Sequence, residues 1–126
     1  MNNHMLPKVS IGMPVYNGGK YIQEAIESLI SQTHRNIEII ISDNDSNDET
    51  ADICIRYSHM DSRIIYIKQE KNLGPWRNFE FVLLNSKSEF FMWAPADDTW
   101  NKNHIELCLD LLIREKTAVA VITKTN

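Results

Sequence analysis

The chain has 126 residues, of which 43% are hydrophobic and 24% are charged, a composition typical of one globular domain. Its formal net charge of -4 argues against a general nucleic-acid binder, because such proteins draw most of their affinity from cationic contacts to phosphate. No run approaches the roughly 20 apolar residues of a membrane span, and residues 1–8 lack the apolar core of a signal peptide. Cys54 and Cys108 form no CxxC pair, which favours two reduced core residues in the cytoplasm.

Short apolar runs alternate with segments of helical periodicity along the chain. Strands are predicted at residues 9–13, 37–42, 64–67, 90–94 and 118–123. Amphipathic helices are predicted at 21–33, at 51–57, from residue 75 onward and from residue 101 onward. This alternation predicts an α/β fold with three α/β/α layers, in which a largely parallel, Rossmann-like sheet carries helices on both faces.

The helix that begins at Pro75 has proline in the favoured first turn. Two histidines, His34 and His104, lie near helix ends and have no partner residues at metal-ligand spacing, so both are expected on the surface. The apolar stripe of the Pro75 helix predicts a buried side made of Trp76, Phe79, Val82 and Leu83.

Two adjacent acids follow the predicted strand at 90–94. Asp97 and Asp98 remain ionised side by side most easily if Mg²⁺ or Mn²⁺ lies between them and a ligand phosphate. The alternative is a polar turn in which Asp98 or Asn101 caps the next helix. The residues alone leave both interpretations open.

A second acidic segment follows the strand at 37–42. Ser46 and Glu49 have the S-x-x-E spacing of a capping box, which predicts that they cap the next helix. Asp43 precedes this cap by three residues and has no evident structural task, so we favour it over Asp48 as a ligand contact. The alternative, an Asx-turn at Asp43 or Asp45, stays open.

All these polar residues fall at one predicted edge of the sheet, where ligands of open α/β sheets bind beyond the carboxyl ends of the strands. Tyr16 follows the first strand, and Arg77 lies near a helix N-terminus, where amides and a guanidinium can meet an anion. The chain has no G-x-G-x-x-G after the first strand and no G-x-x-x-x-G-K-[ST] motif. A nucleotide phosphate would therefore be held by metal.

Four motifs in this order resemble the N-terminal half of family 2 glycosyltransferases, which have the GT-A fold. They are VSIGMPVYN at 9–17, SLISQT at 28–33, IIISDNDSNDET at 39–50 and PADDTW at 95–100. The resemblance covers residues 8–126 and leaves residues 1–7 as a tail. It implies a metal-dependent, inverting transferase that takes a sugar from a nucleotide diphosphate, with UDP the commonest nucleotide.

The resemblance also implies roles for individual residues. Pro14, Val15 and Tyr16 would line the base pocket, Asp43 would accept a hydrogen bond from the base, and Asp45 would lie near the ribose or base.

For the diphosphate, the resemblance implies that Asp98 binds Mn²⁺ or Mg²⁺ and that Asp97 approaches the metal, the ribose or the diphosphate. Arg77 is assigned to the nucleotide as a phosphate contact. Pro95 stands where many members carry a further Asp, so the metal contacts rest on the paired acids.

In this family the acceptor site and the catalytic base belong to a C-terminal half, so no catalytic residue is assigned here. We therefore expect a donor-binding module with little turnover by itself, whose full-length acceptor is a glycan or a lipid-linked molecule in polysaccharide or cell-surface glycan synthesis. A sheet edge or apolar patch left uncovered would favour self-association. The expected location is the cytoplasm, and attachment to the inner face of the membrane stays open.

Two other classes share the alternating plan. A phospho-receiver module would carry acids after its first strand, whereas this chain has Pro-Val-Tyr-Asn there. A metal-dependent nucleotidyltransferase would usually carry a glycine-rich phosphate loop, which the sequence lacks.

Overall fold

The computed structural model describes residues 6–115 and residue 120. Within these residues, four strands alternate with four helices along the chain. The predicted strand at 118–123 falls outside the described residues, apart from Ala120. The elements are β1 (Val9–Val15), α1 (Ile22–Ile30), β2 (Ile37–Asp43), α2 (Thr50–Met60), β3 (Ile64–Lys68), α3 (Pro75–Leu84), β4 (Phe90–Trp93) and α4 (His104–Arg114).

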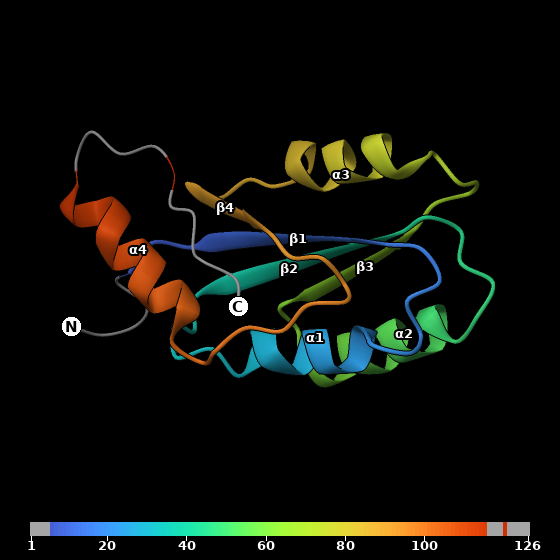
Figure 1. The fold of residues 1–126 in the computed structure, drawn as a ribbon, viewed down its shortest axis with the longest axis horizontal. Helices are drawn as coiled ribbons and strands as arrows, with labels where there is room; N and C mark the ends of the chain where they lie inside the picture. The colour runs from blue at the N-terminus through green and yellow to red at the C-terminus, as the bar shows by residue number, and fades with distance from the viewer. Residues whose placement is uncertain (1–5, 116–119, 121–126) are drawn as a thin grey trace.

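The described strands form one parallel sheet in the order β3-β2-β1-β4. Helices α1 and α2 cover one face of this sheet and α3 covers the other (Figure 1). All seven residues of β1 are buried, because this central strand is covered on both sides. The structure therefore confirms the predicted three-layer α/β fold. None of the helices that the structure describes is long and apolar enough to cross a membrane.

Helix α3 lies close against β1 at Gly12. A Cβ atom built at Gly12 would lie 2.6 Å from Val82 Cγ2 and 2.7 Å from Phe91 Cζ. Only a residue without a side chain permits this approach, because such distances are shorter than van der Waals contact.

The predicted buried side of α3 is right for Val82, which is fully buried, and wrong for its aromatic residues. Trp76 is 79% exposed and Phe79 is 38% exposed. Two hydrogen bonds to β2 set the orientation of the helix instead. The Ser42 hydroxyl donates to Asn78 Oδ1 (2.6 Å), and Asn78 Nδ2 donates to the Ser42 carbonyl (3.0 Å). Asn78 is 2% exposed and thus takes the place that the apolar stripe assigned to larger side chains.

An apolar groove of about 670 Å³ results on the outer side of α3 and β4. The groove lies beside β4, an edge strand of the described sheet. An uncovered apolar patch of this kind can serve as a protein-protein contact. Self-association through it stays a prediction. The groove is lined by Pro75, Trp76, Phe79, Glu80, Leu83 and Trp93.

Both histidines expected on the surface are more buried than predicted. His34 is 2% exposed, and its Nε2 lies 3.0 Å from the Pro7 carbonyl oxygen, because the N-terminal segment covers it. His104 is half-buried, with Nε2 3.8 Å from Cys108 Sγ, and burial lowers the pKa of His104. The sequence pattern did not predict the burial of either histidine, because that burial depends on tertiary packing.

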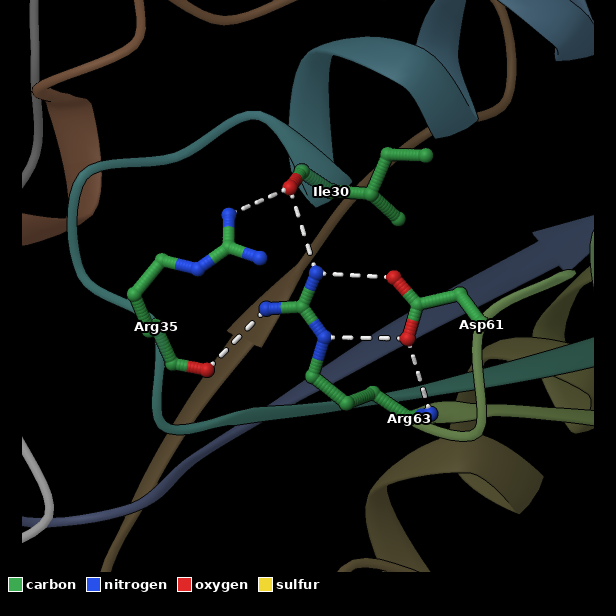
Figure 2. Close-up of polar contacts among 4 residues, drawn as sticks. All are labelled: Ile30, Arg35, Asp61 and Arg63. Atoms are coloured by element: carbon green, nitrogen blue, oxygen red, sulfur yellow. Dashed lines mark hydrogen bonds and ion pairs between the residues drawn. The ribbon is translucent and has the colours of Figure 1, made fainter.

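At the amino ends of the strands, the Arg63 guanidinium joins three segments (Figure 2). It donates to both Asp61 carboxylate oxygens (3.0 and 2.8 Å), to the Ile30 carbonyl (3.1 Å) and to the Arg35 carbonyl (3.0 Å). The hydrogen bonds from Arg63 hold the pKa of Asp61 below its usual value. This cluster ties the end of α1 to the segments that lead into β2 and β3.

Replacing Arg63 by Met should lower the free energy of unfolding by about 2 kcal/mol at pH 7, since the charged hydrogen bonds to Asp61 and to two carbonyls are lost. The carbonyls keep one donor each, Arg35 Nη1 at Ile30 and the Ile37 amide at Arg35. Arg63→Lys should recover only part of the lost stability, because the lysine ammonium group lacks the planar, bidentate donor geometry of the guanidinium. Because the pKa of Asp61 is lower in the folded protein than in the unfolded chain, this carboxylate stabilises the fold at pH values above its unfolded pKa. This stabilisation is lost as the pH falls through the folded pKa. The difference in stability between wild type and Arg63→Met should therefore shrink as the pH falls below the unfolded carboxyl pKa of about 3.9.

Urea denaturation at a series of pH values measures this difference. Arg114→Met is the matched control, because the pair that Arg114 forms among the described residues is with Asp110 on the exposed face of α4, and such pairs contribute less than about 1 kcal/mol. Equal losses in the two variants would contradict the role given to Arg63.

Candidate functional site

The carboxyl ends of the parallel strands meet at one edge of the sheet, and a pocket of about 240 Å³ opens there. Three of the predicted base-pocket residues line it, and the Tyr16 ring is 51% exposed and thus open to a ligand. The lining residues are Pro14, Val15, Tyr16, Asn44, Asn72, Pro75, Asn78 and Phe79.

The pocket also contains two asparagines that the sequence interpretation missed. Asn44 Nδ2 donates to Asn72 Oδ1 (2.9 Å), and Asn44 Oδ1 accepts from the Leu73 amide (2.7 Å). The Gly74 amide, at a residue with φ of 87°, also donates to Asn72 Oδ1 (2.8 Å). In the described part of the chain the Nδ2 group of Asn72 has no partner, so it is available to a ligand. The Asn-x-Gly turn after the third strand was the available signal.

Asp43 has a structural task, contrary to the prediction. Its side chain is fully buried: Oδ1 accepts from the Ser46 amide (2.9 Å), and Oδ2 accepts from the Tyr66 hydroxyl (2.6 Å). The first bond closes a local turn, which is the alternative that the sequence left open. Burial and the bond to Asp43 raise the pKa of Tyr66. Asp43 therefore lies outside the pocket lining.

The predicted capping box is wrong. Helix α2 begins at Thr50, and Glu49, at the capping position, makes no capping bond with its side chain. Asp48 takes this task instead: Oδ1 accepts from the Thr50 amide (3.0 Å) and Oδ2 accepts from the Gly19 amide (3.0 Å). Burial acts to raise the pKa of Asp48, but the hydrogen bonds from Thr50 and Gly19 outweigh it and the pKa is lowered.

Ser46 instead joins the loops that follow β1 and β2. The Asn17 amide donates to Ser46 Oγ (2.8 Å), and the Asn47 amide donates to Asn17 Oδ1 (2.9 Å). Asn17 and Asp45 both adopt left-handed backbone conformations, with φ of 51° and 66°. These contacts fix the backbone beside Tyr16 and leave Asp45 exposed.

Asp97 and Asp98 are both exposed in the loop after β4. The Asp98 amide donates to the Pro95 carbonyl (3.2 Å), and Asp98 Oδ1 accepts from the Thr99 amide (3.1 Å). Within residues 6–115, no group donates a hydrogen bond to the Asp97 carboxylate. Both carboxylates thus keep acceptor capacity for a ligand.

The capping alternative for this loop is not realised. Helix α4 begins at His104 rather than at Asn101, and its capping residue Asn103 makes no side-chain capping bond. The Ile105 amide is taken by Gln32 Oε1 from α1 (3.0 Å). Neither Asp98 nor Asn101 is therefore needed as a cap.

The paired carboxylates suit a hard divalent cation, because Mg²⁺ and Mn²⁺ prefer oxygen ligands. No group of three or more His, Cys, Asp or Glu residues that could hold a metal occurs in the described residues. A cation here would take its remaining ligands from a diphosphate and water, as Mg²⁺ commonly does. Asp97 and Asp98 fit such an ion.

Arg77 is exposed in the first turn of α3 and does not line the pocket. It makes no ion pair or hydrogen bond with any residue that the structure describes. Cys54 is fully buried, and burial together with the charges of Asp43 and Asp48 raises its pKa to about 12, which leaves it inert.

Residues 10–126 match the family described as Glycosyl transferase family 2. An uncharacterized glycosyltransferase of Rickettsia typhi is 39% identical over 110 residues, which is 87% of this chain and 33% of the relative. A putative teichuronic acid biosynthesis glycosyltransferase, TuaG of Bacillus subtilis, is 31% identical over 112 residues, 89% of this chain and 44% of TuaG.

Among solved structures, residues 1–349 of S. aureus TarS in complex with UDP-GlcNAc give a TM-score of 0.80 at 27% identity. The likeness covers 86% of this chain and 32% of that one. The chain spans about a third of the length of its first-ranked curated relatives. The family match favours the glycosyltransferase interpretation over a receiver or a nucleotidyltransferase. With its parallel sheet and its ordered motifs, the chain belongs to glycosyltransferase family 2.

Proposed function

We propose that this chain is the donor-binding part of a metal-dependent, inverting glycosyltransferase and that it binds a nucleotide diphosphate sugar, with UDP as the nucleotide. The observation that carries the proposal is a pocket at the carboxyl end of β1 together with two exposed carboxylates in the loop that follows the neighbouring parallel strand β4. Asp98 itself lines a separate cavity of about 540 Å³ beside α4. The likeness to TarS, a structure that holds UDP-GlcNAc, supports UDP as the nucleotide.

In this proposal Pro14, Val15 and Tyr16 receive the base, and the exposed tyrosine ring stacks on it. Base stacking on an aromatic ring contributes about 1–3 kcal/mol. The free amide of Asn72 donates to a base oxygen, and Asp45 lies near the ribose. Asp43 accepts a hydrogen bond from the base, and because its side chain is fully buried, this contact requires neighbouring groups to shift when the base enters.

Asp98, together with Asp97, would hold Mn²⁺ or Mg²⁺, and Arg77 would turn toward the phosphates. A metal bound there would supply Lewis-acid stabilisation of the nucleoside diphosphate leaving group. The protein groups orient the diphosphate so that the sugar carbon faces the acceptor.

The acceptor and the catalytic base belong, in this proposal, to the further length that the relatives carry. The acceptor is a glycan or a lipid-linked molecule, in line with the polymer biosynthesis named for TuaG. We place the protein in the cytoplasm, where nucleotide sugars serve as donors. The chain alone then binds the donor with little transfer.

Isothermal titration of the 126-residue chain with UDP and with GDP, first in Mn²⁺ and then in EDTA, tests the proposal. We expect UDP to bind more tightly than GDP and to lose at least about tenfold in affinity when EDTA removes the metal. Binding of neither nucleotide would contradict the proposal, and labelling by a small phosphodonor would support the receiver interpretation instead.

A further inference from the structure

One motif of the first helical segment has no part in the site described so far: the Gln32-Thr33 pair just after α1. Gln32 is 1% exposed, although its amide is polar. Its Nε2 donates to the Asn101 carbonyl (2.7 Å) and to the Ser28 carbonyl (3.1 Å), and its Oε1 accepts from the Ile105 amide (3.0 Å). One buried side chain thus satisfies backbone groups of two segments that lie 69 to 73 residues away along the chain.

Neighbouring contacts tie the same segments together. The Trp100 amide donates to Ser28 Oγ (3.2 Å), and the Thr33 amide donates to the Lys102 carbonyl (2.7 Å). The Thr33 hydroxyl donates to Glu106 Oε2 (2.8 Å). Residues 100–106 are therefore held against the end of α1 by backbone and side-chain hydrogen bonds.

The paired carboxylates lie between this attachment and β4. On the strand side, the Ala94 amide donates to the Gly12 carbonyl of β1 (2.8 Å). On the helix side, the first tie is at Trp100, two residues after Asp98. Asp97 and Asp98 are thus carried on a short loop that is fixed at both ends.

The same helix also positions the loop that carries Tyr16. The Ile22 amide at the start of α1 donates to the Gly18 carbonyl (2.9 Å), and the Gly18 amide donates to Thr50 Oγ1 (2.9 Å). Helix α1 therefore connects the base pocket at one end to the carboxylate loop at the other.

From this arrangement we infer that Gln32 is a positioning residue for the metal and diphosphate site: it sets Asp97 and Asp98 relative to the base pocket without touching the ligand. This inference rests on the proposed function. Groups that orient metal ligands from outside the coordination shell typically change metal affinity by about 10–100-fold when they are mutated.

A merely structural role for Gln32 makes a different prediction. Loosening the whole domain would weaken UDP binding equally with and without metal, because the base pocket and the carboxylate loop would be affected together. A positioning role weakens only the part of the affinity that depends on metal. The ratio of the UDP dissociation constant in EDTA to that in Mn²⁺ separates the two roles.

Titration of UDP into Gln32→Met, which keeps the length of the side chain and removes its hydrogen-bonding groups, measures this ratio. We expect the ratio to fall about tenfold, with the affinity in EDTA unchanged. Ser28→Ala removes the acceptor of the Trp100 amide at less risk to folding and should lower the ratio in the same direction by less. Gln23→Met is the matched control, because Gln23 is exposed on α1 and bonds only to surface side chains.

Three results would overturn the inference. The first is a ratio in Gln32→Met and Ser28→Ala equal to that of wild type, and the second is an equal loss of affinity with and without metal. In both cases the proposed function would stand, because wild type still binds UDP with metal. The third is a wild-type chain that binds no UDP, which would overturn the proposed function and this inference together.

Discussion

Asp98→Ala should abolish the gain in UDP affinity that Mn²⁺ provides, while it leaves the affinity in EDTA unchanged. Asp98 is exposed, and within the described part of the chain its carboxylate accepts a hydrogen bond from the Thr99 amide alone, so its loss leaves the loop intact but removes a hard oxygen ligand. The loss should be at least as large as the roughly 10–100-fold typical of removing a group that merely orients a metal ligand.

Two further variants, measured in the same titrations, serve as comparisons for Asp98→Ala. Tyr16→Ala should weaken UDP binding by a similar factor in Mn²⁺ and in EDTA, because base stacking does not depend on metal. Asp110→Asn removes an exposed carboxylate that pairs with Arg114 on α4 and should leave both affinities as in wild type. If Asp98→Ala kept the full gain from Mn²⁺, the assignment of the metal to this loop would be wrong.

Gly12→Ala should lower the free energy of unfolding by about 1–3 kcal/mol, the usual cost of overpacking a core. The added Cβ would lie 2.6 Å from Cγ2 of the fully buried Val82 and 2.7 Å from Phe91 Cζ, so neighbouring atoms must shift to make room for it. A glycine-to-alanine change by itself usually stabilises a protein by about 0.4–1 kcal/mol through the unfolded chain. A net loss would therefore measure the contact between α3 and β1.

The double variant Gly12→Ala/Val82→Ala tests the cause. Removing the Val82 methyl groups relieves the shortest contact, so the double variant should lose less stability than the two single variants together. Urea denaturation gives all three values. Strict additivity would show that the cost of Gly12→Ala does not arise at Val82 Cγ2 but at the contacts that remain, Phe91 Cζ and Val82 Cβ.

The fold could be predicted because its periodic signals are local. The strands β1 and β2 are buried along almost their whole length, so their runs are mostly apolar and easily recognised. The orientation of α3 could not be predicted in the same way. Its stripe favours Trp76 as a buried residue, whereas the hydrogen bonds between Asn78 and Ser42, 36 residues apart, turn the helix so that Trp76 is exposed.

The sequence indicated those candidate residues that directly follow a strand. It did not indicate those whose placement depends on contacts between distant segments. Tyr16 follows β1 and the pair Asp97 and Asp98 follows β4, and these strands are parallel neighbours, so both loops leave the carboxyl ends of the sheet. That they form one site stays a prediction. The burial of Asp43 under the Tyr66 hydroxyl depends on the pairing of β2 with β3, which sequence spacing does not reveal. The Asn-x-Gly turn could have indicated Asn72, whereas its contact with Asn44 could not be read from sequence spacing.

Helix α1 is attached at both ends, and this restricts how its length can vary. Its nine residues rise by about 14 Å, and one inserted residue would rotate everything beyond it by about 100°. An insertion would therefore move Gln32 away from the Ile105 amide and the Asn101 carbonyl if Gly18 kept its contacts, or shift the Tyr16 loop if Gln32 kept its own. Members of this family that retain both attachments should keep this helix at constant length and place their insertions in surface loops.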